Sequence, residues 1–170
     1  MAIREIKKYP ESVLRGKTEP VEEFNEELQE LIEDMIETMY AAPGIGLAAN
    51  QVGVARQVTV IDVSLGSDKE ALIVLVNPEI VHCEGEESSE EGCLSIPGYT
   101  TMVKRFTKVK VQAQDRNGNP VEIDGEGLLA RALQHELDHL NGKLFVDRIG
   151  RIKREFFKKR YSREKVGSSK

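Results

Sequence analysis

The sequence predicts an α+β fold, in which antiparallel or mixed strands pack around a central helix that carries a metal-binding motif. Short β-branched runs separated by turn residues occupy the middle of the chain, from residue 58 to residue 123. A segment with helical apolar spacing precedes these runs and two more follow them. Because the strands come together instead of alternating with helices, the pattern favours α+β over a regular βαβ fold.

The N-terminal helix is predicted from Asn25 to about Tyr40, after a short extended segment over residues 3–9. Asn25 suits the N-cap because its side-chain oxygen can accept a hydrogen bond from the first turn. The carboxylates of Glu26 and Glu27 suit the positive end of the helix dipole. One face is apolar at helical spacing, through Leu28, Leu31, Ile32, Met35, Ile36 and Met39.

The strands follow in two groups, the first of which begins as a strand pair. Residues 58–63 and 71–76 are β-branched runs separated by a Gly-Ser-Asp turn, which predicts that they pair. Asn77-Pro78 is expected to end the second strand, because proline cannot donate to the ladder.

The second group begins with a short strand over residues 80–83, followed by an acidic loop over residues 84–91. Residues 107–114 alternate apolar and polar side chains, and an Asn-Gly-Asn-Pro turn leads from them into residues 121–123. This spacing predicts a β-hairpin.

A second long helix is predicted over residues 147–165, fraying into residues 167–170. Its apolar side chains Ile152, Phe156 and Phe157 are expected to hold it against the body. The helix and tail are strongly basic. They could contact a polyanion through backbone charge, or they could be a solvated helix face.

The distribution of charge and the length of the chain predict one domain. Residues 151–170 hold nine Lys/Arg against two Glu, a net charge of +7, so residues 1–150 carry −12. Residues 1–150 are expected to form a single catalytic domain, with the basic helix and tail over residues 147–170 as part of it.

Composition excludes several classes of protein. Charged residues at 31% and apolar residues at 39% are typical of a soluble globular chain, and no apolar run approaches a membrane span. The N-terminal residues contain no apolar signal core, so a cytoplasmic location is expected. Cys83 and Cys93 are too few for a disulfide framework.

The chemistry is predicted at residues 128–142, where an apolar helical stripe carries the pattern H-E-x-x-H. On a helix, His135 and His139 lie one turn apart on the same face, where two imidazoles can bind one metal ion. Glu136 beside them can take the proton of a metal-bound water. The alternative is that both histidines are packed and hydrogen-bonded for structural reasons only.

A catalytic site of this kind needs a third protein ligand. Cys93 is the best candidate, because it lies among Gly92, Pro97 and Gly98, where backbone can approach a ligand closely. Cys83 is the competitor and is interpreted as a buried thiol. His82 is interpreted as a structural or surface residue.

A second uncharged, glycine-rich stretch covers residues 44–53. It lacks the Lys-Ser/Thr pair of a phosphate-binding loop and follows no predicted strand, so it could be only a tight loop on the core. Gln51 is the only amide in it that is a candidate donor to a developing oxyanion.

Three stretches together resemble the motifs of the peptide deformylase family. They are GIGLAANQ from Gly44, EGCLS from Glu91 and QHELDHLNG from Gln134, in the family's order, within a similarity that covers nearly the whole chain. The resemblance implies a hydrolase that removes the N-formyl group from formylmethionine of nascent polypeptides and releases formate.

The resemblance also implies roles for individual residues. Cys93, His135 and His139 would be the metal ligands, and Glu136 the general base and acid. The Gln51 side chain and the Leu94 backbone N–H would donate to the oxygen of the attacked carbonyl. In the family the peptide pairs with a strand edge and its methionine enters an apolar pocket, which would be lined here by Ile45, Gly46, Leu128, Ala132 and the His135 ring. Ser89 and Arg131 would lie near its rim.

The ligand types by themselves favour zinc, whereas the resemblance implies Fe²⁺, with Zn²⁺, Ni²⁺ or Co²⁺ as substitutes. The basic C-terminal helix resembles the one with which some bacterial deformylases dock near the ribosomal exit tunnel, so it could bind ribosomal RNA there. A monomer is expected. Asp138 is interpreted as structural, paired with a cation such as Arg105, and Glu90 and Glu91 as loop charges.

Two alternatives are weighed against the deformylase interpretation. A zincin-type metallopeptidase shares the H-E-x-x-H pattern, but no histidine follows His139 to complete its usual ligand set. A ribosome-associated binding module with a structural metal would need a closed set of four ligands, and only three are convincing.

Overall fold

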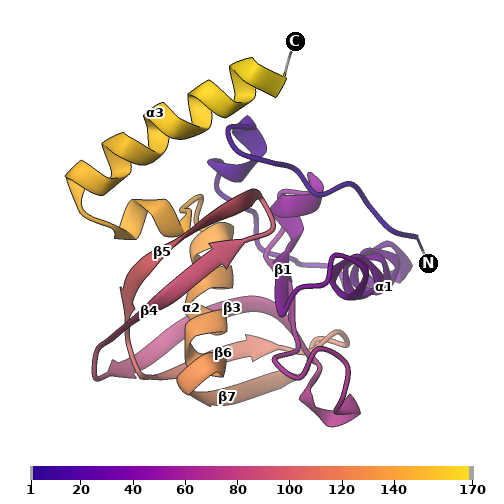
Figure 1. The fold of residues 1–170 in the computed structure, drawn as a ribbon. Coiled ribbons are helices and arrows are strands. Elements are labelled where there is room, and N and C mark those ends of the chain that lie inside the picture. Colours follow the sequence, from indigo (N-terminus) through magenta and orange to yellow (C-terminus); the bar gives the residue numbers. More distant parts are fainter. Residues whose placement is uncertain (1, 169–170) are drawn as a thin grey trace.

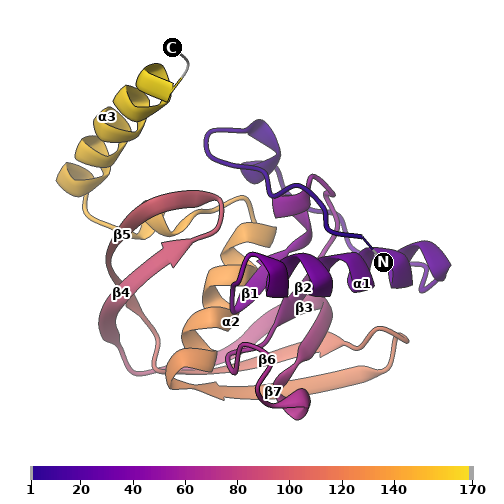
Figure 2. The same ribbon diagram turned by 45° about the vertical axis from the view of Figure 1, so that its right-hand side comes forward.

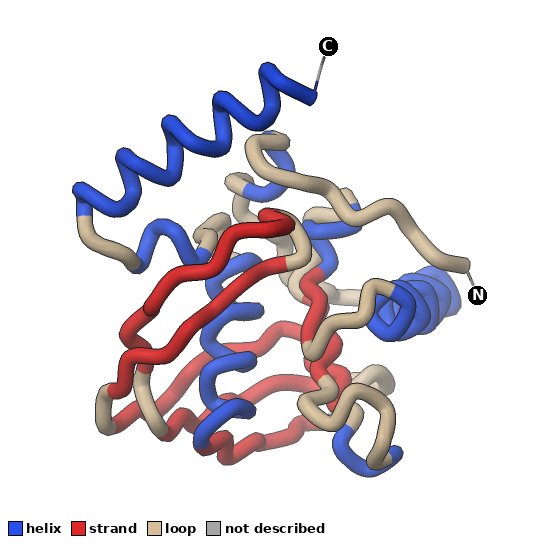
Figure 3. The backbone as a smooth tube through the Cα atoms, in the orientation of Figure 1, coloured by secondary structure: helices blue, strands red, loops and turns tan. Residues whose placement is uncertain are grey.

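The computed structural model describes residues 2–168 and shows two sheets and three α-helices (Figures 1 and 3). The helices are α1 (Glu26–Ala41), α2 (Gly127–Leu140) and α3 (Arg151–Ser168). The strands are β1 (Gly46–Ala48), β2 (Val58–Ile61), β3 (Ile73–Glu84), β4 (Glu87–Cys93), β5 (Ile96–Arg105), β6 (Lys108–Gln114) and β7 (Pro120–Glu126).

All strand pairs within the two sheets are antiparallel. The larger sheet has the order β1-β2-β3-β6-β7, and β4 pairs with β5 in a separate hairpin. Helix α2 runs between the larger sheet and the β4–β5 hairpin (Figures 1 and 2). The α+β class expected from the sequence is confirmed, with the motif helix at the centre.

Helices α1 and α2 cover opposite faces of the β1–β2 end of the larger sheet. Leu47 and Val60, which face each other across the two strands, pack into the apolar cluster formed with α1. Ile61, the next residue of β2, packs into the cluster formed with α2. Helix α1 begins as expected, because the Asn25 side chain accepts a hydrogen bond from the Leu28 N–H.

Strand β3 continues through Asn77-Pro78, so the expectation that this pair ends the strand is wrong. The register between β3 and β6 shifts between Val76 and Glu79, which places the proline in an irregularity where no ladder hydrogen bond is needed. Asn77 adopts φ 53°, a left-handed conformation that asparagine tolerates better than most residues. Its side chain also bonds to the Val21 backbone.

The acidic segment expected to be a loop is largely strand β4. Nothing in its polar sequence shows strand periodicity, and it is paired residue by residue with β5 from Glu87↔Arg105 to Glu91↔Thr101. Strand β4 therefore forms because it pairs with β5 and contacts α2, and not because of the local propensity of its residues. The other hairpin, β6–β7, has the position expected from its turn residues.

The C-terminal helix begins at Arg151 and not at residue 147, because Phe145–Arg148 forms a separate 3-10 turn. Phe157 is buried against Tyr9, with 5.3 Å between ring centroids. Ile152 and Phe156 are 74% and 69% exposed, so the expectation that they hold the helix to the body is wrong. Residues 169–170 of the expected frayed tail lie outside the described residues, and 167 and 168 are helical.

Helix α3 lies beyond the β4–β5 hairpin, at the end of the molecule opposite β7 (Figures 1 and 2). Within residues 2–168, no helix has the length and apolar character that a membrane span requires. The N-terminal residues expected to be extended form no strand, although the Lys7 and Tyr9 N–H groups donate to the backbone of Gln51 and Ser95.

The loop between β2 and β3 is organised by the buried carboxylate of Asp62. Its oxygens accept hydrogen bonds from the Ser64 backbone and hydroxyl, the Tyr40 hydroxyl at 2.5 Å and the Gly66 N–H. Burial opposes ionisation, but these donors outweigh it and lower the pKa of Asp62 below its ordinary value of 3.8. Burial, followed by the hydrogen bond to Asp62, raises the pKa of Tyr40 to about 12.

The lowered pKa makes the stability contribution of Asp62 dependent on pH. The ionised carboxylate stabilises the fold above its unfolded-state pKa, and this contribution is lost as the pH falls through the folded-state value. We expect the free energy of unfolding to decline below about pH 5 and to decline less steeply in Asp62→Asn. Urea denaturation at a series of pH values measures this, with Asp68→Asn in the same loop as the control. Equal slopes in wild type and Asp62→Asn would contradict the expectation.

Candidate metal centre

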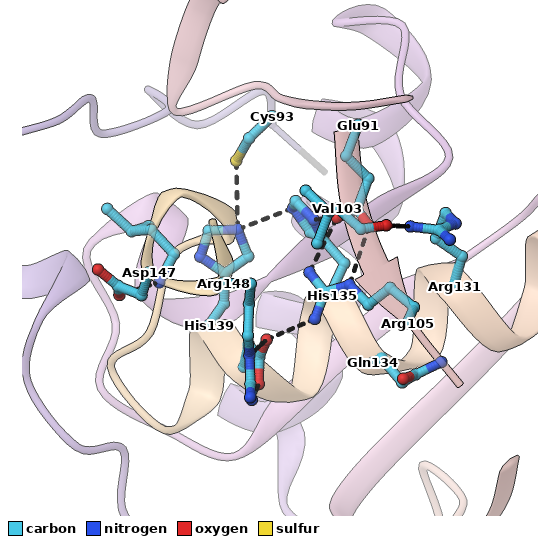
Figure 4. A network of polar contacts seen from close by, with 12 residues as sticks. Glu91, Cys93, Val103, Arg105, Arg131, Gln134, His135, His139, Asp147 and Arg148 are labelled. Atoms are coloured by element: carbon cyan, nitrogen blue, oxygen red, sulfur yellow. Dashed lines mark hydrogen bonds and ion pairs between the residues drawn. The ribbon is translucent and has the colours of Figure 1, made fainter. Parts of the chain in front are cut away.

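Helix α2 and the end of strand β4 bring three potential metal ligands together (Figure 4). The Nε2 atoms of His135 and His139 are 3.2 Å apart, as expected for one face of a helix. Cys93 Sγ lies 3.2 Å from His139 Nε2, and the three ligand atoms lie within 4.8 Å of one another. The structure thus brings together the residues singled out in the sequence as ligands.

The second ring nitrogen of His135 is held by Glu91 of β4. His135 Nδ1 lies 2.9 Å from Glu91 Oε1, and the Glu91 side chain is buried. The same carboxylate accepts hydrogen bonds from Arg105 at 2.9 and 2.8 Å and from Arg131 at 2.5 Å (Figure 4). Burial opposes ionisation of Glu91, yet Arg105 and then His135 outweigh it and lower the pKa of Glu91 to about 2.

The interpretation of Glu91 as a loop charge is therefore wrong. A carboxylate in this position fixes the orientation and tautomer of a ligating imidazole, a contact typical of protein metal sites. The only signal in the sequence was that Glu91 stands in the EGCLS stretch two residues before Cys93. The neighbouring Glu90 is an exposed charge, as expected, and bonds to Thr100, but it lies in strand β4 and not in a loop.

The expected pairing of Asp138 with Arg105 is confirmed. Arg105 Nη1 lies 2.6 Å from Asp138 Oδ2, and both side chains are buried. Arg148 also donates to both oxygens of Asp138, at 3.0 and 2.6 Å. Because Arg105 on β5 bridges Glu91 on β4 and Asp138 on α2, the hairpin and the motif helix are joined by buried charge.

Glu136 is buried beside the ligand cluster. Its Oε1 atom has no hydrogen-bond partner among the described residues, and burial raises the pKa of Glu136 to about 7. Backbone passes very close to its other oxygen: a Cβ atom added at Gly46 would lie 2.5 Å from Glu136 Oε2. Gly46 is thus a glycine because a side chain there would displace the carboxylate.

The pKa values of the two histidines shift in opposite directions, because the two rings are buried and close together. Burial, followed by the charge of His135, lowers the pKa of His139 well below its ordinary value. Burial also disfavours the charged form of His135, but hydrogen bonds with Cys93 and Glu91 outweigh it and raise its pKa. His139 is therefore neutral near pH 7, with a lone pair available.

Gln51 is oriented by its surroundings. Its Oε1 atom accepts a hydrogen bond from the Ala48 N–H at 3.0 Å, so the amide nitrogen faces the other way. That nitrogen donates to Ser95 Oγ at 3.0 Å and lies 3.7 Å from Cys93 Sγ. The side chain is buried, and its N–H groups are directed toward the ligand cluster.

The cluster opens into a cavity of about 780 Å³, and the residues expected to bind substrate line it. They are Ile45, Gly46, Leu128 and Ala132, together with Leu94 and Arg131. Leu128 is 54% exposed and stands at the mouth, whereas Ala132 is buried. Ser89 lines a smaller adjoining cavity that shares Leu128 and Arg131 with the first.

His82 and Cys83 are not brought to this cluster. His82 is exposed, with Nε2 lying 3.1 Å from Glu84 Oε2, in agreement with its interpretation as a surface residue. Cys83 is half-buried and packs against the apolar cluster under α2.

The residues present fit a metal ion. A thiol and two imidazoles with converging atoms form a ligand set used for catalytic zinc and related ions. The buried Glu136 Oε1 that lacks a partner within the described chain fits a site designed to hold a further group, such as water.

With this geometry in place, comparison with known proteins is decisive. The sequence profile of the family described as Polypeptide deformylase matches residues 3–155. The chain belongs to the polypeptide deformylase family. This family is metal-dependent, and the chain is therefore a hydrolase with a metal-binding site. The zincin and binding-module alternatives receive no support from the comparisons.

Relatives in this family match the chain closely over most of its length. Peptide deformylase of Thermodesulfovibrio yellowstonii is 57% identical over 165 residues, covering 97% of this chain and 100% of the relative. The crystal structure of a peptide deformylase from Legionella pneumophila superposes with a TM-score of 0.91 at 51% identity, covering 99% of both chains. That of Synechococcus elongatus, in complex with actinonin, gives 0.85 at 44% identity, covering 89% of this chain and 83% of that one.

The contacts of Glu91 predict a large loss of stability on its replacement. Glu91→Gln removes the charge that compensates buried Arg105, and breaking a buried pair on one side costs about 3–5 kcal/mol. We expect a loss of this size in the free energy of unfolding by denaturant. The exposed neighbour provides the control, since Glu90→Gln should change stability by less than about 0.5 kcal/mol. Similar losses in both variants would show that the buried network contributes nothing specific.

Proposed function

We propose that this chain removes the N-formyl group from N-formylmethionine at the start of nascent polypeptides, releasing formate. The observation that carries the proposal is the convergence of Cys93, His135 and His139 beside the buried carboxylate of Glu136. Cys93, His135 and Glu136 line a cavity of about 780 Å³, which is large enough for a peptide end. Family membership supports the same activity.

Cys93, His135 and His139 are proposed as the metal ligands, and Fe²⁺ as the ion in the cell, with Zn²⁺, Ni²⁺ or Co²⁺ as substitutes. Imidazole serves iron, zinc and nickel alike, so the choice of iron rests on the resemblance to the family and not on ligand type. A divalent ion held here would supply Lewis-acid activation of water near neutral pH.

Glu136 is proposed as the residue that moves the proton. Its pKa of about 7 suits a group that both accepts and releases a proton at working pH. It takes the proton of the attacking water and passes it to the nitrogen of the departing amine. Without this transfer the leaving group would be an amide anion, which is a poor leaving group.

Gln51 and Leu94 are proposed to stabilise the negative charge that develops on the formyl oxygen. The Gln51 amide is suited to this role because its carbonyl is already bonded to the Ala48 N–H and its N–H groups face Cys93. Leu94 follows Cys93 directly and lines the same cavity, where its backbone N–H would be the second donor.

The formylated peptide is proposed to bind in extended form along β1, which is the edge strand of the larger sheet. The methionine side chain would enter the apolar part of the cavity between Ile45 and the start of α2, formed by Leu128 and Ala132. Gly46 allows the peptide end to come close to Glu136, because it has no side chain of its own.

We further propose that the protein is a cytoplasmic monomer in which residues 1–150 and the C-terminal helix form one domain. Burial of Phe157 against Tyr9 supports the inclusion of α3. The exposed, basic α3, with Ile152 and Phe156 uncovered, supports docking to the ribosome near the exit tunnel.

Docking of this kind should depend strongly on salt, because counterions are released from RNA phosphates. When ribosomes are pelleted by centrifugation, we expect the chain to sediment with them at low salt. As the salt concentration rises, the chain should remain in the supernatant. A variant in which Lys158 and Lys159 are both replaced by Glu should be retained less even at low salt. Equal retention of wild type and variant would contradict docking through α3.

Measurement of formate release tests the proposed deformylase activity. Iron-loaded protein under anaerobic conditions should hydrolyse N-formyl-Met-Ala. Glu136→Gln keeps the shape of the side chain but cannot accept the proton, and we expect its turnover to fall by about 10²–10⁴. Iron content is measured in both proteins, so that loss of proton transfer is separated from loss of metal. No formate from wild-type protein with one iron per chain would refute the proposal.

A further inference from the structure

A small cavity of about 170 Å³ lies where the beginning of α3 meets the body of the protein, and it is called the α3 cavity below. It shares no lining residue with the cavity of the metal centre. Basic side chains outnumber acidic ones in its lining, which carries a net charge of +2 at neutral pH. The charged residues are Arg15, Asp147, Arg151, Arg154, Glu155 and Lys158.

These charged side chains come from three segments that are far apart in the sequence. Arg15 directly follows the 3-10 turn Ser12–Leu14, and Asp147 belongs to the 3-10 turn Phe145–Arg148. The other four lie on α3 at positions 151, 154, 155 and 158, the spacing of one helix face. This face of α3 is therefore turned toward the cavity, whereas the exposed Ile152 and Phe156 belong to another face.

Apolar side chains complete the lining and close one side of the α3 cavity. Val146 and Phe157 are 1% and 2% exposed, and the ring of Tyr9 packs against that of Phe157. The Tyr9 N–H donates to the Ser95 carbonyl at 2.8 Å, which ties this side of the cavity to the body. Because apolar groups exclude water there, charges in the cavity interact more strongly than charges on an open surface.

Two of the basic side chains are already paired within the lining. Arg15 donates to the carboxylate of Asp147, which also accepts a hydrogen bond from the Leu144 N–H at 2.9 Å. Lys158 Nζ lies 4.0 Å from Glu155 Oε1. These two pairs account for both carboxylates, so the excess positive charge belongs to the other two arginines.

The guanidinium groups of Arg151 and Arg154 have no such partner. Within residues 2–168, neither side chain forms a hydrogen bond or an ion pair. The two residues lie one turn apart on the helix, where like charges repel each other. An anion between them would remove this repulsion. A guanidinium remains charged and presents a planar fork of N–H donors, which matches two oxygens of a phosphate group.

The size of the α3 cavity suits a single phosphate group. A water molecule occupies about 30 Å³ in the liquid, so about 170 Å³ admits about five groups of that size. A phosphate ion consists of a phosphorus atom and four oxygen atoms, each roughly as large as a water molecule or smaller. Above about pH 7 it carries close to two negative charges, which match the charge of the two unpaired arginines.

We propose that the α3 cavity binds one phosphate dianion, either the free ion or the terminal group of a phosphomonoester. Arg151 and Arg154 donate to its oxygens, and Arg15 and Lys158 add positive charge from the other sides. The bound group links the start of α3 to the N-terminal segment, because Arg15 belongs to that segment. This site is independent of the proposed deformylase activity, and its failure would leave that activity untouched.

A titration of zinc-loaded, full-length protein with inorganic phosphate, followed by amide NMR signals at about pH 7.5, tests the site. About 0.15 M KCl is present, so that charges more than about 8 Å apart are screened. The signals of Arg15, Arg151 and Arg154 should shift with one common Kd. Replacing both Arg151 and Arg154 by Gln should weaken binding by at least about tenfold, because charge-assisted hydrogen bonds are lost.

The matched control replaces Lys153 and Lys159 by Gln. It removes the same charge from exposed positions of the same helix that do not line the α3 cavity, and it should change Kd by less than about twofold. Equal weakening in the two double variants, or shifts spread evenly along α3, would overturn the proposal, because either result indicates attraction to the helix as a whole.

Two further ligands identify the chemical group that is bound. Ethyl phosphate is a monoester, and binding as tight as that of inorganic phosphate would show that the site accepts a substituted dianion. Binding of inorganic phosphate alone would identify the ligand as the free ion. Dimethyl phosphate carries a single negative charge and should bind at least about tenfold more weakly. If it binds as tightly as the dianions, the proposal is wrong.

Thermal unfolding separates loss of the site from damage to the fold. In chloride buffer, the Arg151/Arg154 double variant should unfold at the wild-type temperature, because these side chains have no partner to lose within the described residues. Phosphate at about ten times its Kd should raise the wild-type midpoint by about 3–6 °C and leave that of the variant unchanged. A wild-type midpoint that does not rise with phosphate would contradict the proposal.

Discussion

The buried ion network around Arg105 is the constraint on which the rest of the site depends. Arg105 bonds to Glu91 on β4 and to Asp138 on α2, and all three side chains are almost inaccessible to water. Such charges are costly to bury and are tolerated only as a complete set. Completing the set fixes the β4–β5 hairpin against α2. This packing places Cys93 beside the two histidines. It also orients the His135 ring, because Glu91 Oε1 lies within hydrogen-bond distance of His135 Nδ1.

A second constraint is the space around the Gly44–Gly46 segment. Gly46 brings backbone to within van der Waals contact of Glu136, and a Cβ at Gly44 would lie 2.7 Å from Leu94. The strand edge, the buried carboxylate and the turn after Cys93 are therefore packed as closely as glycine permits. A Cβ atom at either glycine would meet these neighbours, so both positions must lack a side chain. The same segment is bonded to the Asp62 turn.

The elements whose formation depends on residues near one another in the sequence were predicted correctly. The cap at Asn25, the β6–β7 hairpin and the motif helix were predicted correctly, because capping, turn residues and apolar period are encoded within a few residues. Strand β4 and the role of Glu91 were missed, since both depend on partners far away in sequence, such as Arg105 and Arg131. The exposure of Ile152 and Phe156 was missed for a similar reason, because an apolar residue on a helix does not show which face is covered.

The most direct test of this account is the coordination of the bound ion, measured by X-ray absorption on zinc-loaded protein, because Zn²⁺ has no redox chemistry. The account predicts one sulfur at about 2.3 Å and two nitrogens at about 2.0–2.1 Å, with the sulfur absent in Cys93→Ser. A shell without sulfur, or one with two sulfurs, would contradict the claim that the docked hairpin and α2 together form the metal centre.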